Sequence, residues 1–125
     1  MIDQCCRAIL AAALALCGMA CQPTTEDKLG TFSGNPERGR LLADQYGCGT
    51  CHRIPQVPGA RGQVGPPLEQ MGRRGYIAGI LPNTEQAMIA WLLSPRTFAA
   101  DTAMPDVGLT EEQARDIAAF LQRLR

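Results

Sequence analysis

The most constraining feature of this 125-residue chain is the pentapeptide Cys48-Gly49-Thr50-Cys51-His52. His52 is the only histidine in the sequence, and it directly follows two cysteines spaced three positions apart. On a helical turn, side chains three and four positions apart lie on one face, so both thiols and the imidazole can act on one bound group. The spacing therefore predicts a cofactor or metal site here.

Three kinds of site use such a motif. A thioredoxin-like redox pair needs a strand–helix–strand setting, and no stretch alternates strongly enough to predict a strand. A structural zinc site needs four nitrogen or sulfur ligands, and beyond residue 20 only Cys21 could supply a fourth. Covalent attachment of c-type haem needs two thiols for the vinyl groups of the porphyrin and one histidine for the iron. We interpret the motif as a haem c site.

Residues 1–20 are predicted to be a signal peptide. Their apolar run, from about residue 9 to 19, is shorter than the about 20 residues that a membrane span needs. Gly18 and Ala20 bracket a cleavage point before Cys21. This point fits cleavage by an ordinary signal peptidase. It fits the lipoprotein pattern only in part, because that pattern favours a large aliphatic residue where this chain has Gly18. A free thiol at a mature N-terminus is reactive in an oxidising compartment, which favours lipid on Cys21.

The remaining chain divides into a polar tether and a body. Residues 21–35 are predicted to be a flexible tether, which would include a lipid anchor at Cys21. Residues 36–125 are predicted to form one domain. The predicted location is the periplasm or the outer face of the cytoplasmic membrane. With 12 basic and 12 acidic residues, nothing indicates nucleic-acid binding. Arginines at 53, 61, 73, 74 and 96 and acids at 101, 106, 111, 112 and 116 could orient a partner or form a solvated surface.

Three helices are predicted in the body, which makes the fold class all-α. The first follows the cap residue Asn35 and runs to about residue 46, and the second begins at 83 or 84 and ends near 94. The third begins with a capping box at Thr110 and Gln113. The Gly- and Pro-rich residues 53–83 lack predicted regular structure, so they need something to wrap around. A domain of about 90 residues also buries a hydrophobic core that is only marginally stable without a cofactor.

These segments resemble a class I monohaem cytochrome c over residues 36–125. The sequence GCGTCHRI is similar to the family's attachment site. VGPPLEQMGRRGYIAGILPN and TAMPDVGLTEEQARDIAAFLQRL resemble still more closely the haem c domains fused to subunit II of some haem–copper oxidases. The copper-binding part of that subunit is not expected in this chain. The resemblance implies helices wrapped around one covalent haem c.

A second ligand of the iron cannot be a histidine of this chain, because no second histidine exists, so the methionines of the body are the candidates. Met71 is expected in a short turn and Met88 on a helix face, where methionine is usually core filler. Met104 precedes Pro105, which stiffens its loop, and the resemblance implies that Met104 is the ligand. His–Met ligation leaves no open position at the iron and suits one-electron transfer.

The resemblance assigns four further residues. The carbonyl of Pro66 would accept the outer N–H of His52. Arg74 would pair with a haem propionate and Trp91 would donate its indole N–H to one, although a surface charge and a plain core residue are the alternatives. Gly39 would allow the first and last helices to cross closely, where Ile117 and Phe120 pack.

The expected function is electron transfer between redox proteins, with no catalysis of its own. A haem–copper oxidase is one expected partner. One alternative is a haem subunit of a larger oxidoreductase complex. Another is a haem enzyme or gas sensor with an open iron site, which carbon monoxide binding to the reduced protein would reveal.

Overall fold

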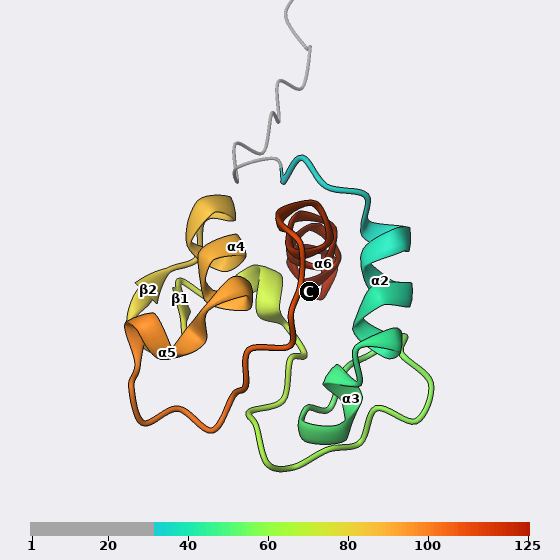
Figure 1. Ribbon diagram of the computed structural model, residues 1–125. Helices are drawn as coiled ribbons and strands as arrows, with labels where there is room; N and C mark the ends of the chain where they lie inside the picture. The colour runs from blue at the N-terminus through green and yellow to red at the C-terminus, as the bar shows by residue number, and fades with distance from the viewer. Residues whose placement is uncertain (1–31) are drawn as a thin grey trace, which may run out of the picture.

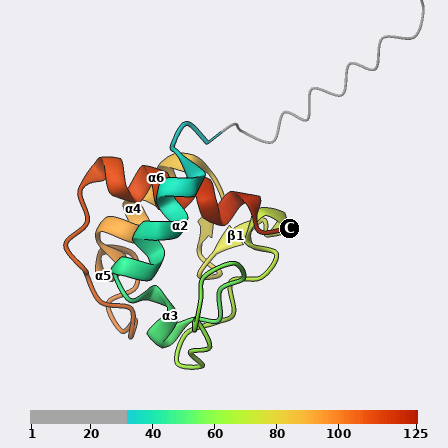
Figure 2. The same ribbon diagram turned by 90° about the vertical axis from the view of Figure 1, so that its right-hand side faces the viewer.

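The computed structural model describes residues 32–125, and in this part of the chain α6 (Glu111–Arg123) lies at the centre. Helix α2 (Pro36–Gln45) packs on one side of it and α4 (Glu85–Leu93) on the other (Figure 1). Figure 2 shows α2 and α6 crossing each other. The signal peptide, its cleavage point and Cys21 lie outside the described residues.

Short elements connect these three helices. They are α3 (Cys48–Cys51), the 3-10 turn η1 (Met71–Arg73), the strands β1 (Tyr76–Ile77) and β2 (Leu81–Pro82), and α5 (Pro95–Phe98). Among residues 32–125, no helix is long and apolar enough to cross a bilayer.

The predicted helix starts are confirmed, because the capping side chains form the expected bonds. Asn35 accepts a hydrogen bond from the backbone N–H of Arg38 at 3.0 Å, and Thr84 caps α4 through the N–H of Ala87. Thr110 and Gln113 form the reciprocal capping box of α6. Each cap satisfies backbone donors that the first turn of a helix leaves free.

The close crossing expected at Gly39 is also confirmed. A Cβ at this position would overlap the backbone carbonyl of Asp116 on α6. The apolar face of α6, with Ile117 and Phe120 almost fully buried, packs into the core below this crossing. A residue without a side chain is therefore what lets α2 approach α6.

The prediction that the body has no strand is wrong in one place. β1 and β2 pair antiparallel, with Tyr76 opposite Pro82 and Ile77 opposite Leu81. Each strand has only two residues, which is too few for an alternating pattern to show in the sequence. The turn itself is made by Ala78 and Gly79, both with positive φ.

The last residues of the expected tether lie against the domain. Phe32 packs on the core, and both the backbone N–H and the hydroxyl of Ser33 donate to a carboxylate oxygen of Glu85. The backbone N–H of Asn35 donates to Asp116 at 2.7 Å. The contacts of the domain therefore extend to Phe32, four residues before α2.

Candidate cofactor site

The Cys-x-x-Cys-His motif forms a single helical turn that is set off from α2 by a sharp bend. Gly47, with φ of 69°, makes the bend, and α3 follows as one turn from Cys48 to Cys51. The backbone N–H of His52 closes the turn on the carbonyl of Cys48 at 3.0 Å. His52 then leaves in an extended conformation. Cys51 and His52 thereby line a cavity, while Cys48 packs half-buried against the core.

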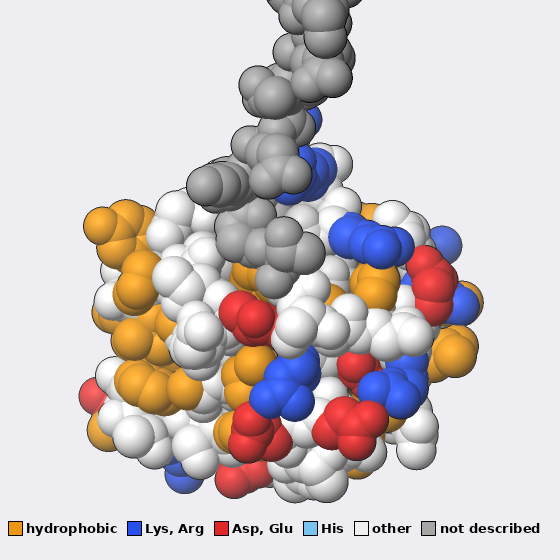
Figure 3. Space-filling model, turned by 90° about the horizontal axis from the view of Figure 1, so that it is seen from above, with side chains coloured by type: hydrophobic (Ala, Val, Ile, Leu, Met, Phe, Trp, Pro, Cys, Tyr) orange, Lys and Arg blue, Asp and Glu red, His pale blue; other side chains and the backbone are white. Residues whose placement is uncertain are grey.

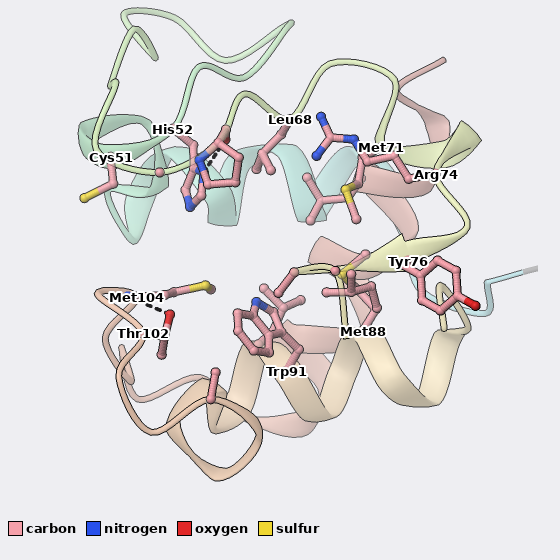
Figure 4. Close-up of a pocket in the computed structure, with 18 of the residues that line it drawn as sticks. Cys51, His52, Leu68, Met71, Arg74, Tyr76, Met88, Trp91, Thr102 and Met104 are labelled. Carbon is pink, nitrogen blue, oxygen red and sulfur yellow. Dashed lines mark hydrogen bonds between the residues drawn. The ribbon is translucent and has the colours of Figure 1, made fainter. Parts of the chain in front are cut away.

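The cavity has a volume of about 680 Å³ and lies between α3 with its following loop and the segment from α4 to Met104. This size falls within the roughly 300–1,000 Å³ range of sites that hold a cofactor or drug-sized ligand. Its lining is mainly apolar, and Figure 4 shows Leu68, Met71, Met88 and Trp91 along its length. The cavity thus suits a large apolar group.

The ring of His52 is held in place by contacts with Gly65 and Pro66. Its Nδ1 lies 2.7 Å from the carbonyl oxygen of Pro66, the contact that the resemblance implied. A Cβ on Gly65 would overlap the same ring, so only glycine fits there. When Nδ1–H donates to Pro66, Nε2 keeps its lone pair, and Figure 4 shows this second nitrogen directed into the cavity. This orientation is the one that a metal-binding histidine needs.

Met104 lies on the wall opposite His52 (Figure 4). Its loop is braced locally, because its backbone N–H donates to the hydroxyl of Thr102 at 3.3 Å. Met71 and Met88 also line the cavity, but they are 4% and 1% exposed and lie toward its other end. Among the three candidate methionines, only Met104 stands across the cavity from the imidazole.

Arg74 and Trp91 both line the cavity, each with a donor group. Arg74 donates through Nη2 to the backbone carbonyls of Pro67 and Glu69. Trp91 is 8% exposed, and within residues 32–125 its indole N–H has no hydrogen-bond partner. Figure 4 shows this nitrogen on the cavity side of the ring. An unpaired donor on an apolar wall fits a cofactor that carries acceptor oxygens.

The donor set fits a c-type haem better than the alternatives. Two thiols are adjacent to one imidazole, and a thioether lies on the facing wall of an apolar cavity. A zinc site is not supported, because residues 32–125 contain no group of three or more His, Cys, Asp or Glu side chains placed to hold a metal ion. Burial raises the pKa of the Cys48 thiol, which favours its neutral form.

Two positioning residues at the site were not predicted from the sequence. Asn83 donates through Nδ2 to the carbonyls of Met71 and Arg74, at 2.9 Å each, and so holds η1 against the cavity. Thr102 braces the Met104 loop. The available signals were weak, because an Asn before a helix cap and a Thr two residues before a Met are common in any turn.

Comparisons with known proteins agree with this geometry. Residues 36–125 match the family model described as Cytochrome c. The chain is 29% identical over 89 residues to the protein called "Cytochrome c oxidase subunit 2" of Alkalihalophilus pseudofirmus. The matched part is 70% of this chain and 25% of that protein, so the chain spans about a quarter of its relative. No solved structure matches.

Proposed function

Because the chain belongs to the cytochrome c family and is thus an electron-transfer protein with covalent haem c, we propose that His52 and Met104 are its axial ligands. The observation that carries this proposal is the placement of His52 and Met104 on opposite walls of one apolar cavity. When bound, haem c supplies an iron that exchanges single electrons.

The side chains around the site each have a defined task in this proposal. Cys48 and Cys51 form the covalent links, and Pro66 and Gly65 hold the imidazole of His52 in one orientation. Thr102 holds the loop that presents Met104. With the imidazole of His52 and the thioether of Met104 both holding the iron, the site would leave no position for a substrate, and the thioether would raise the reduction potential.

Arg74 and Trp91 are proposed to serve the acidic groups of the cofactor. Trp91 has a free donor on the cavity wall within the described residues. Arg74 keeps further guanidinium N–H groups beyond the Nη2 that binds the backbone. Both would neutralise or solvate carboxylates that would otherwise be buried without partners.

The proposed setting is outside the cytoplasmic membrane. The N-terminal sequence supports export, and a lipid on Cys21 would keep the domain at the membrane surface. There it would take electrons from one redox protein and deliver them to another. A haem–copper oxidase is a candidate acceptor.

A second candidate function is supported by the similarity to an oxidase subunit. The chain would then be a permanent haem subunit of a larger oxidoreductase complex. Purification distinguishes the two: a stoichiometric partner that survives mild detergent favours the subunit, and isolation as a single chain favours the mobile carrier.

Two measurements on the purified haem-loaded protein test the proposal. A potentiometric titration should follow a single one-electron transition. Carbon monoxide added to the reduced protein at neutral pH should leave its spectrum unchanged, because both axial positions are filled. Rapid carbon monoxide binding would reject the proposed ligation and favour an enzyme or gas sensor.

A further inference from the structure

Three segments that contribute to the wall of the cavity carry no charged residue. They are residues 47–51, 62–67 and 102–105, and together we call them the uncharged rim. Members of all three line the same cavity: Cys51 from the first, Val64, Gly65 and Pro66 from the second, and Thr102, Ala103 and Met104 from the third. They therefore meet at one cavity, although 19% of the whole sequence is charged.

No residue of the uncharged rim is buried, and most of its side chains are apolar. Val64 is 75% exposed, the highest value among the large apolar side chains that the structure leaves accessible. Pro66, Ala103 and Pro105 are exposed beside it. Single exposed apolar residues are ordinary, but this group is concentrated at the cavity, which marks an interaction site.

The nearest charged residues along the chain have opposite signs. Arg61 precedes the second segment, while Asp101 and Asp106 flank the third. Arg53 is already paired with Glu69. Arg74 lines the cavity, but Figure 4 places it well away from Cys51. Charges of both signs around a neutral patch cancel at a distance, and salt screens the remainder within about 10 Å.

Charge is instead concentrated elsewhere on the molecule. The ion pairs Arg38–Glu112, Arg115–Glu111 and Arg123–Glu37 lie on α2 and α6. Figure 3 shows basic and acidic side chains intermixed on this face, which is the end of the molecule away from α3 in Figure 1. These pairs neutralise each other locally and give no steering field toward the cavity.

We propose that the uncharged rim docks a redox protein whose own docking face is apolar and uncharged. The proposal rests on the proposed electron-transfer function and specifies the chemistry of its partner. Contact through small apolar residues brings the two centres close, and the complex forms and separates without ion pairs. Such interfaces are small, as transient electron-transfer contacts are. Association should therefore be nearly independent of ionic strength.

A second copy of this chain is the probe, since its rim has the required chemistry. In electron self-exchange, one reduced copy loses an electron and one oxidised copy gains it, so the step balances without another reagent. The rate can be measured by NMR on mixtures of the two forms of the haem-loaded protein. Because the polypeptide has a formal net charge of +0, only the charges of the haem add to it, and salt dependence reports mainly on the docking face. The rate should change less than about twofold between about 0.01 and 0.5 M salt.

Val64→Lys should place like charges face to face. Self-exchange at low salt should fall by about tenfold and recover in high salt. Ala103→Lys, on the opposite segment, should do the same and serves if the first variant fails to incorporate haem. Leu41→Lys is the matched control, because Leu41 is 57% exposed on α2 and does not line the cavity. It should behave as the unaltered protein.

The outcomes distinguish a failure of the docking proposal from a failure of the proposed electron-transfer function. If the protein does not cycle by one electron at all, the proposed function fails. If it cycles but unaltered self-exchange varies more than about fivefold with salt, docking depends on charge and the rim proposal is overturned. An equal effect of Leu41→Lys and Val64→Lys would overturn it too.

Discussion

Asp116 is the residue whose role differs most from the sequence-based expectation. It was grouped with four other acids that could face a partner, but it is 2% exposed and accepts hydrogen bonds from Arg38 and from the backbone N–H of Asn35. Desolvation works to raise the pKa of Asp116, but these hydrogen bonds outweigh it and hold that pKa below its ordinary value. Asp116 therefore joins the start of α2 to α6.

Asp116→Asn should lower the free energy of unfolding by about 2 kcal/mol at pH 7, since hydrogen bonds to a charged group are lost. A depressed pKa stabilises the fold above the unfolded value of about 3.9, and this contribution disappears as pH falls through the folded pKa. The difference between variant and unaltered protein should therefore shrink below about pH 4. Urea unfolding at several pH values measures it.

The control for this prediction is Asp44→Asn on α2, because Asp44 is exposed. It should change stability by less than about 0.5 kcal/mol, as surface substitutions usually do. An Asp116→Asn deficit that stayed constant down to pH 2 would show that the contribution does not come from the ionised carboxylate.

At the scale of elements, the helices were predictable and the middle of the chain was not. Caps such as Asn35 and Thr110 act through bonds within one turn, so sequence alone locates them. The β1–β2 hairpin and the hold of Asn83 on η1 depend on contacts between segments, which local patterns do not record. The motif at Cys48 predicted its own position and the resemblance implied Met104, but only the folded chain shows the two facing each other across one cavity.

The crossing of α2 and α6 gives a prediction at the same scale. Gly39→Ala should destabilise the protein by about 1–3 kcal/mol, because the new methyl group meets the backbone of Asp116 and forces the helices apart. This loss would exceed the gain of about 1 kcal/mol that alanine gives a helix. Thermal unfolding measures the net change in stability from the steric clash and the higher helix propensity of alanine.

Gly75→Ala is the matched control, since nothing lies within 4 Å of a Cβ at that position. Its unfolding temperature should be unchanged or slightly raised. If Gly39→Ala were equally harmless, the close crossing would not be a requirement of the fold.

For the molecule as a whole, the cavity of about 680 Å³ means that the apolar walls have no protein partner across it. Contacts to a bound cofactor would supply what protein–protein packing does not. Cys48→Ala combined with Cys51→Ala should therefore give a largely unfolded chain. Circular dichroism during heating measures this, and a cooperative transition in the haem-free variant would show that the core forms without its cofactor.

Anchoring is a separate property of the whole molecule. Cys21 lies outside the described residues, and lipid on it is a prediction from sequence. Cys21→Ser should move the protein from the membrane to the soluble periplasmic fraction with its haem retained. Mass spectrometry of the unaltered protein provides the check: a soluble product with an unmodified Cys21 would contradict the lipoprotein hypothesis.

The absorption spectrum of Met104→Ala tests the central claim most directly. Haem should stay attached, because Cys48 and Cys51 are unchanged. The weak sulfur-to-iron band of the oxidised form in the red region should vanish, the reduction potential should fall, and carbon monoxide should bind the reduced form. Met88→Ala and Met71→Ala should keep the band and lose stability only. Persistence of the band in Met104→Ala together with its loss in Met88→Ala would contradict the assigned ligand and the opposed geometry on which it depends.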